Sequence, residues 1–164
     1  MRKVPPSRSF QKSQGPSIMA EFYIEEGAVA NVELALAEKS GFSWTLYGDT
    51  SLDSSIAAWL ESYCSGKEPT IVLPLLIEEL PSYTKKVLRA LRKIPLGTTT
   101  TYQTLAQITG NPRAARAVGN ACGRNPVPLI IPCHRVLAAG GRLGGFSQGP
   151  GIKERLLSFE LRRK

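Results

Sequence analysis

Short apolar stretches bounded by turn residues dominate the first half of the chain. Three of them, at residues 20–24, 32–36 and 42–47, have the composition of β-strands, and glycine-containing turns separate them. A fourth apolar run covers residues 70–77, where Pro74 leaves both a strand and a loop open. The pattern predicts a small sheet.

Helical spacing begins near residue 53. Asp53 or Ser54 can cap a helix that runs to about Cys64. One face of this helix is apolar and holds Ile56, Trp59, Leu60 and Tyr63. The first half therefore predicts a small α/β scaffold with an antiparallel sheet. It shows no phosphate loop, metal cluster or catalytic pair.

The second half has the spacing of several helices. Serine, threonine and asparagine caps predict helices over residues 82–93, 102–109 and 111–122, the last with proline at its first position. The last two are joined by a short turn that contains Gly110. Two helices joined in this way form the helix-turn-helix pattern of DNA-binding proteins.

The predicted helix over residues 111–122 has two different faces. Its inner face holds Ala115, Val118, Gly119 and Cys122, so we expect Cys122 to be structural. Its outer face is small except for Arg113, Arg116 and Asn120. Small residues let a helix approach a duplex closely, and arginine can pair with phosphate or enter a groove.

A glycine-rich segment, residues 140–151, follows further along and contains Phe146 and Ser147. It matches neither a Walker loop nor a dinucleotide-binding fingerprint. It predicts either a flexible lid over a pocket or a turn-rich wing.

The last predicted helix covers residues 152–163. Its buried face holds Ile152, Leu156 and Phe159, and Glu160 lies at the edge of that face. A half-buried carboxylate needs a partner. The candidates are His134 and a basic residue such as Lys153.

Length and composition describe a soluble globular protein of one or two domains, with 164 residues, of which 42% are hydrophobic and 21% charged. We expect a flexible tail over residues 1–17, which lacks the apolar core of a secretory signal, an N-terminal domain over 18–80 and a C-terminal domain over 81–164. No apolar run reaches the roughly 20 residues of a membrane span. The three cysteines have no paired spacing, which favours a reducing compartment.

Charge is divided unequally along the chain. Residues 1–80 carry six Lys and Arg against eleven Asp and Glu, a net charge of −5. Residues 81–164 carry fifteen against two, a net charge of +13. A basic half of this kind indicates a domain that binds a polyanion, although charge for solubility alone is the alternative.

The single histidine of the sequence directly follows a cysteine. Cys133 and His134 come after the apolar run Val127–Ile131 and Pro132, a pattern typical of a short buried strand. A thiol beside an imidazole suggests a nucleophile and its base. A small core cysteine is the alternative. Successive strand residues point to opposite faces, so contact between the two side chains requires a turn or a bridging water.

The combined motifs of residues 80–161 resemble the O6-alkylguanine-DNA alkyltransferases, also called methylated-DNA–protein-cysteine methyltransferases. The motifs are Pro132-Cys133-His134-Arg135-Val136, preceded by Asn125-Pro-Val-Pro, then Thr101-Tyr102-Gln103, Ala114-Ala-Arg-Ala-Val-Gly119, Gly145-Phe146-Ser147 and Glu160. The resemblance implies a C-terminal domain with a winged helix-turn-helix. It also implies one irreversible transfer of an alkyl group from O6-alkylguanine, and from O4-alkylthymine, in duplex DNA, after the base is flipped through the minor groove.

The same resemblance implies roles for the reacting centre. Cys133 is the nucleophile, and His134, working through a water and held by Glu160, takes its proton. Asn125 matches the hinge asparagine of the family, which braces the site.

It also implies the contacts with substrate. Tyr102 assists flipping and donates to the guanine ring, Arg116 fills the vacated stack, and Arg113 lies beside it as a DNA contact. The Val136 region and Ser147 contact the base, with Ser147 near O6.

Two departures from the family pattern stand out. Phe146, which we also expect to contact the substrate, stands where some members carry tyrosine. The N-terminal half, with Cys64 as its only cysteine and no histidine, cannot build the four-ligand zinc site of some eukaryotic members. We expect no metal, no cofactor and a monomer. We expect the protein to be located with the chromosomal DNA, in the cytoplasm or, in a eukaryote, in the nucleus.

Three other functions compete with alkyl transfer. A lesion-binding module without repair activity would replace the cysteine, which Cys133 argues against. A thiol hydrolase would need an oxyanion hole and a base held against the thiol. A transcription regulator would explain the charge, but not the Cys-His-Glu set.

Overall fold

The structure is a computed structural model and describes residues 6–162. The chain divides into two compact units, which separate between residues 76 and 77. The boundary expected between residues 80 and 81 falls four residues later. No helix among the described residues has both the length and the apolar character needed to cross a membrane.

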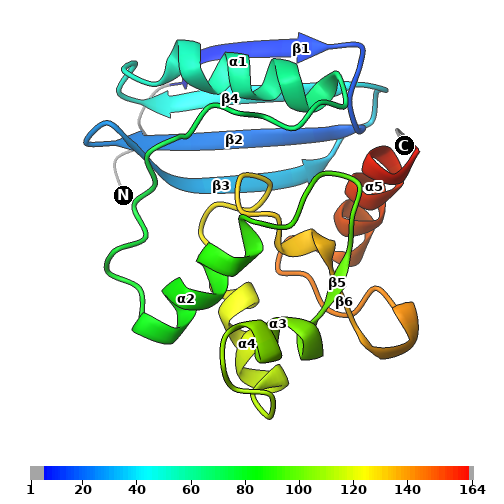
Figure 1. The fold of residues 1–164 in the computed structure, drawn as a ribbon. Helices are drawn as coiled ribbons and strands as arrows, with labels where there is room; N and C mark the ends of the chain where they lie inside the picture. Colours follow the sequence, from blue (N-terminus) through cyan, green and yellow to red (C-terminus); the bar gives the residue numbers. More distant parts are fainter. Residues whose placement is uncertain (1–5, 163–164) are drawn as a thin grey trace. The chain divides into compact units, whose positions relative to one another are not determined.

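A four-stranded sheet forms the first unit (Figure 1). Its strands are β1 (Pro6–Lys12), β2 (Ile18–Glu25), β3 (Ala28–Leu36) and β4 (Phe42–Gly48), in the order β1-β4-β2-β3. β2 and β3 form a hairpin whose turn residues Glu26 and Gly27 both have positive φ, as the right-handed twist of a two-residue hairpin favours.

The sheet is mixed, so the expectation of an antiparallel sheet is wrong for one pair. β2 and β4 are parallel, whereas β1–β4 and β2–β3 are antiparallel. After the hairpin, β4 runs in the same direction as β2. It pairs with the free edge of β2 and not with β3.

The expectation of a flexible tail is also wrong for residues 6–12, which form β1; residues 1–5 lie outside the described part. β1 pairs along β4 from Pro6 to Lys12. The stretch has little apolar character, but an edge strand is recruited through its main-chain groups. Phe10 adds a stacked contact with Trp44, with ring centroids 5.3 Å apart.

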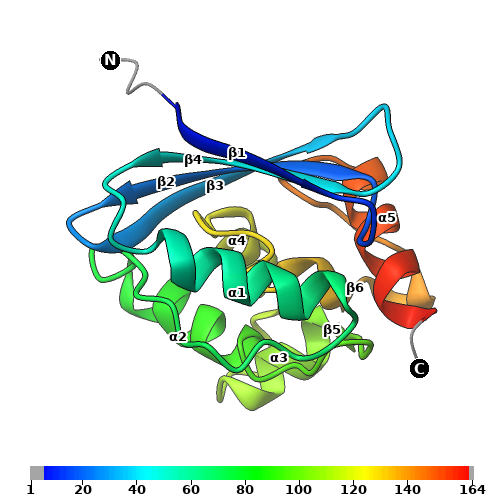
Figure 2. The ribbon, with the colours of Figure 1, turned by 90° about the horizontal axis from the view of Figure 1, so that it is seen from above.

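One face of the sheet is buried together with helix α1 (Asp53–Cys64), which lies across it in both views (Figures 1 and 2). Alternate residues of β2, from Ile18 to Ile24, are buried, and so are the four apolar helix residues expected. The helix starts without a side-chain cap, on Leu52. The later run 70–77 is a loop, attached by the main-chain bridge between Val29 and Leu75.

Helices dominate the second unit (Figure 1). They are α2 (Ser82–Leu91), α3 (Tyr102–Ile108), α4 (Ala115–Gly123) and α5 (Pro150–Leu161), with 3-10 turns η1 (Cys133–Arg135) and η2 (Ala139–Gly141). The short strands β5 (Thr100–Thr101) and β6 (Val136–Leu137) pair in parallel. α2 and α3 both pack on α4, and α5 packs on η1.

The two helices of the expected helix-turn-helix are present with one difference. The Thr101 hydroxyl caps α3 by accepting from the Thr104 N–H at 3.1 Å, as expected. α4 begins at Ala115 and not at the Asn111-Pro112 pair, because those residues form a turn. The Pro112 carbonyl accepts a hydrogen bond of 2.7 Å from the Gln103 side chain.

The strand expected at 127–131 is absent. These residues form a buried turn in which Leu129 has a φ of +77° and Ile131 N–H donates to the Val127 carbonyl at 3.0 Å. The continuous apolar run therefore predicted the burial of these residues correctly, but it predicted the wrong backbone conformation.

Candidate active site

Cys133 begins the 3-10 turn η1, directly after Pro132. Its residue is 4% exposed, and the Asn125 side-chain amide donates a hydrogen bond of 3.2 Å to its sulfur. The same amide donates to the Ile131 carbonyl at 2.9 Å, and the Asn125 oxygen accepts from the Val127 N–H at 3.1 Å. Asn125 thus ties the buried turn to the thiol and orients it.

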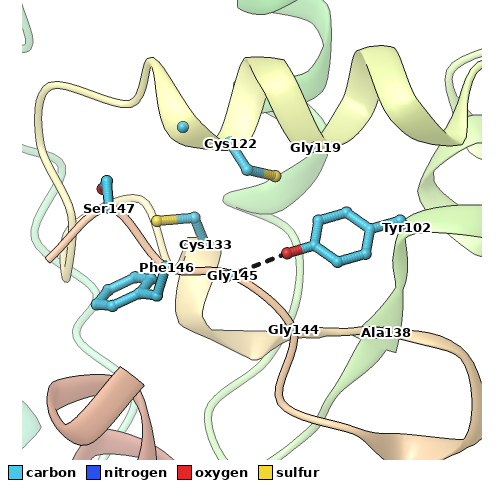
Figure 3. A pocket seen from close by; sticks show the side chains of 10 residues that line it. Tyr102, Gly119, Cys122, Cys133, Ala138, Gly144, Gly145, Phe146 and Ser147 are labelled. Carbon is cyan, nitrogen blue, oxygen red and sulfur yellow. Dashed lines mark hydrogen bonds between the residues drawn. The ribbon is translucent and has the colours of Figure 1, made fainter. Parts of the chain in front are cut away.

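A pocket of about 400 Å³ opens beside this thiol (Figure 3). It is lined by Tyr102, Gly119, Cys122, Gly123, Cys133, Ala138, Gly144, Gly145, Phe146 and Ser147. Such a volume falls within the range of sites for small organic groups. The walls come from α3, α4, η1 and the glycine-rich segment, so that segment serves as a pocket wall.

A buried polar network begins at His134, the residue after Cys133. His134 Nε2 is 2.6 Å from Glu160 Oε1, and both side chains are almost fully buried. Because Glu160 is ionised, the ring nitrogen that faces it carries the proton. In the neutral ring Nδ1 is then a bare acceptor, and this buried atom has no protein partner among the described residues.

Glu160 pairs with the expected His134 and with a basic residue, which is Arg135 and not the Lys153 named as a candidate. Arg135 Nε donates to Glu160 Oε2 at 2.8 Å, and Arg135 Nη2 donates to Oε1 at 3.2 Å. Arg135 also donates to the Ile94 carbonyl at 2.6 Å. Burial acts to raise the pKa of Glu160, but the charges and hydrogen bonds of His134 and Arg135 outweigh it and lower this pKa to about 2.

We expect this carboxylate to make the protein sensitive to acid. The pKa of Glu160 is lower in the folded state than its ordinary 4.5, so its stabilisation is complete above about pH 5 and is lost as pH falls toward 2. The contribution is about 3 kcal/mol of unfolding free energy. Urea unfolding measured between pH 6 and pH 3 should show this dependence of the unfolding free energy on pH. Glu160→Gln should flatten it, whereas the exposed control Glu154→Gln should leave it.

Sequence reasoning considered Lys153 only as a partner of Glu160 and missed its place at the pocket wall. Lys153 is 0% exposed, and its ammonium donates to the Val136 carbonyl at 2.6 Å and the Gly145 carbonyl at 3.2 Å. It therefore fastens β6 to the pocket wall. The spacing of Lys153, Leu156, Leu157 and Glu160 along one helix face was the signal that could have found it. Phe159, expected inside, is only half-buried.

Burial and local charge act on the thiol in opposite directions. Burial raises the pKa of Cys133, while the Asn125 hydrogen bond and the Lys153 charge act to lower it. Burial in turn lowers the pKa of Lys153, opposed by the two nearby thiols. Since the Cys133 pKa is raised overall, the resting group is the thiol, and reaction requires a base.

The expected substrate contacts surround the pocket unevenly. Tyr102, Phe146 and Ser147 line it, and the Tyr102 hydroxyl donates to the Gly145 carbonyl at 3.3 Å (Figure 3). The Phe146 ring meets His134 edge-on, with centroids 6.5 Å apart. Val136 is fully buried and not part of the lining. Cys122, expected to be structural only, is buried but lines the pocket.

Arg113 and Arg116 are exposed, as expected for the outer face of α4. Arg116 lines a second hollow of about 600 Å³ together with Tyr102, Gln103 and Asn120. Tyr102 lines both hollows, so the outer face of α4 and the thiol pocket are adjacent.

Comparison with known proteins agrees with this geometry. Residues 82–162 match the sequence model described as 6-O-methylguanine DNA methyltransferase, DNA binding domain. The crystal structure of Mycobacterium tuberculosis OGT in complex with DNA aligns with 88% of this chain and 94% of that chain, with a TM-score of 0.69 and 30% identity. The chain belongs to the O6-methylguanine-DNA methyltransferase family. The resemblance drawn from the motifs is thereby confirmed, and so is a mixed α/β fold.

Archaeal members of the family are also similar in sequence. Proteins named methylated-DNA–protein-cysteine methyltransferase from Methanosarcina acetivorans and Methanosarcina barkeri are 46% and 48% identical over 101 and 104 residues. These alignments cover 62% and 63% of this chain, and 64% and 65% of the relatives. The chain thus spans slightly less than two thirds of their length.

Proposed function

We propose that this protein repairs DNA by moving the alkyl group of O6-alkylguanine to the sulfur of Cys133. The observation that carries the proposal is a buried thiol held at an open pocket, together with a buried His-Glu pair that begins at the next residue of the chain. Relatives that share the family are named for this activity. O4-alkylthymine presents the same kind of alkyl ether and is the second substrate.

The chemistry requires no cofactor. His134, through a bridging water, takes the proton of the Cys133 thiol, and the thiolate attacks the alkyl carbon. The S–C bond forms as the C–O6 bond breaks, and the electron pair of that bond goes to the base. Tyr102 in the pocket wall assists by donating to the guanine ring. The resulting thioether is stable, so each molecule reacts once.

Duplex DNA must be opened for the base to reach the pocket. We propose that α3 and α4, with the β5–β6 region and the glycine-rich segment as the wing, form a winged helix-turn-helix. α4 enters the minor groove with its small outer face, because small residues permit close approach. Arg116 fills the stack that the flipped base leaves, Arg113 pairs with the backbone, and the base enters the pocket.

The proposal includes a monomer acting on double-stranded DNA, without membrane attachment. The protein would be located where chromosomal DNA is, in the cytoplasm or in the nucleus of a eukaryote.

Mass spectrometry tests the activity directly. After incubation with an oligonucleotide duplex that carries one O6-methylguanine, the intact protein should gain one methyl group, and peptide mapping should place it on Cys133. The amount should saturate at one methyl group per molecule. DNA binding with an unmodified cysteine would refute repair, and repeated turnover would refute single transfer.

Arg116→Ala should slow repair of duplex DNA by roughly 10- to 100-fold, because unstacking a base costs a few kcal/mol and nothing then fills the gap. Reaction with free O6-benzylguanine should change little. Single-turnover rates on both substrates measure this. The control is Arg155→Ala, which removes the same charge from an exposed position of α5. Equal losses on both substrates would contradict a role in flipping.

Binding to DNA should weaken as salt is added, because the basic half would release counterions from phosphate. Fluorescence anisotropy between 50 and 300 mM salt should show a linear fall of log affinity with log salt concentration, on the order of one unit of slope per phosphate contact. Arg113→Ala should reduce the slope by about one. A flat salt response would exclude phosphate contacts.

A further inference from the structure

The pocket contains a second thiol that alkyl transfer does not use. Cys122 lies in the last turn of α4, eleven residues before Cys133, and both line the same pocket. Figure 3 shows their side chains entering the space between α4 and η1 from different elements. Both are free cysteines here.

We propose that Cys122 is a resolving cysteine, which forms a reversible disulfide with Cys133 when peroxide oxidises the protein. The inference deepens the proposed function, because its consequence is a reversible block of alkyl transfer. Bond formation itself depends only on the two thiols and the open pocket.

The two thiols line the same pocket but are not yet aligned. After burial, the charge of Cys133 contributes to raising the pKa of Cys122 to about 12. In Figure 3 the sulfurs are turned apart, so a bond requires rotation about the Cα–Cβ bonds. Cys122 lies one residue before Gly123, the last residue of α4, where a helix end can adjust.

The reaction balances with peroxide as the oxidant. The Cys133 thiolate attacks one peroxide oxygen, an S–O bond forms, the O–O bond breaks, and hydroxide leaves and takes up the thiol proton as water. The Cys122 sulfur then attacks the sulfenic sulfur, the S–S bond forms, the S–O bond breaks, and its proton leaves with the oxygen as a second water. Two thiols lose two electrons, and one peroxide becomes two waters.

Cys133 is the thiol that peroxide meets first. The Asn125 side-chain amide donates to the Cys133 sulfur and favours its anion, whereas the charge of the buried Lys153 ammonium acts on both thiols. Without a resolving partner, the sulfenic acid would proceed to sulfinic and sulfonic acids, which thiol reductants do not reverse. The disulfide would preserve an acceptor that can be used only once.

The test treats the reduced full chain with hydrogen peroxide in the absence of DNA, followed by mass spectrometry without reductant. The expected product has lost two hydrogen atoms, and its peptides are joined between Cys122 and Cys133. Alkyl transfer should fall at least tenfold and return to most of its initial level after dithiothreitol. Products that carry only added oxygen atoms, or a disulfide between two chains, would overturn the proposal.

Two variants separate resolution from general oxidation. Cys122→Ser, compared with its own activity before peroxide, should recover little after dithiothreitol and should accumulate oxygen on Cys133. Cys64→Ala, altered in the other unit, should behave as the parent protein. Equal recovery in Cys122→Ser would refute the resolving role. Alkyl transfer by the untreated, reduced protein tests the proposed function separately. The loss of two hydrogen atoms on oxidation is measured on the parent protein itself, so that result does not depend on whether a variant folds.

Discussion

Cys133→Ala is expected to abolish methyl transfer while leaving DNA affinity nearly unchanged. The Cys133 sulfur is the only protein atom that forms a bond in the proposed reaction. The exposed arginines of α4, which would contact DNA, are not altered. Intact-mass measurements should find no methylated protein at any time, and anisotropy with duplex DNA should give a dissociation constant within a few-fold of the parent.

The control for Cys133→Ala is Cys64→Ala, which removes another buried thiol, in the first unit. It should still accept one methyl group per molecule. Methylation of Cys122 in the Cys133→Ala protein would contradict the assignment of a single acceptor, because both thiols line the pocket.

Glu160→Gln should have the second large effect, on both stability and transfer. The substitution leaves the buried guanidinium of Arg135 without its compensating charge, which costs about 3–5 kcal/mol of unfolding free energy. It also removes the carboxylate that orients His134 and stabilises its protonated form, so the transfer rate should fall roughly 100-fold. Urea unfolding and single-turnover kinetics measure the two effects.

Two comparisons distinguish a role in catalysis from a role in folding. The exposed Glu154→Gln variant on the same helix should change neither the unfolding free energy nor the transfer rate. Rates for Glu160→Gln must be taken where circular dichroism shows a folded protein, and their dependence on pH should differ from that of the parent. An unchanged pH profile with only a lower melting temperature would mean that Glu160 supports the fold alone.

Local pattern predicted most elements of the first unit but not how they pair. β2, β3, β4 and the apolar face of α1 follow from alternation and helical spacing, which depend only on neighbouring residues. β1 does not, because its residues have little apolar character and it is held by main-chain bonds to β4. The parallel pairing of β2 with β4 joins segments that are distant in sequence.

Some features of the site were likewise predictable from local sequence, and others were not. The Cys133-His134 pair, Glu160 on the inner edge of its helix and the exposed arginines of α4 were all predictable from residue type and angle. The turn over Val127–Ile131 was not, since an apolar run predicts burial and leaves conformation open.

By itself the sequence determined the family and the two-part division of charge, and it predicts Cys133 as the nucleophile, because these depend on which residues occur in which local order. Only the tertiary structure decided that Asn125 holds the thiol and that Arg135 shares Glu160 with His134. It also decided that Cys122 faces the same pocket as Cys133 and that Lys153 fastens β6 to the pocket wall. Those contacts join separate elements of the second unit. Their distances depend on how α4, η1 and α5 pack, which no local pattern specifies.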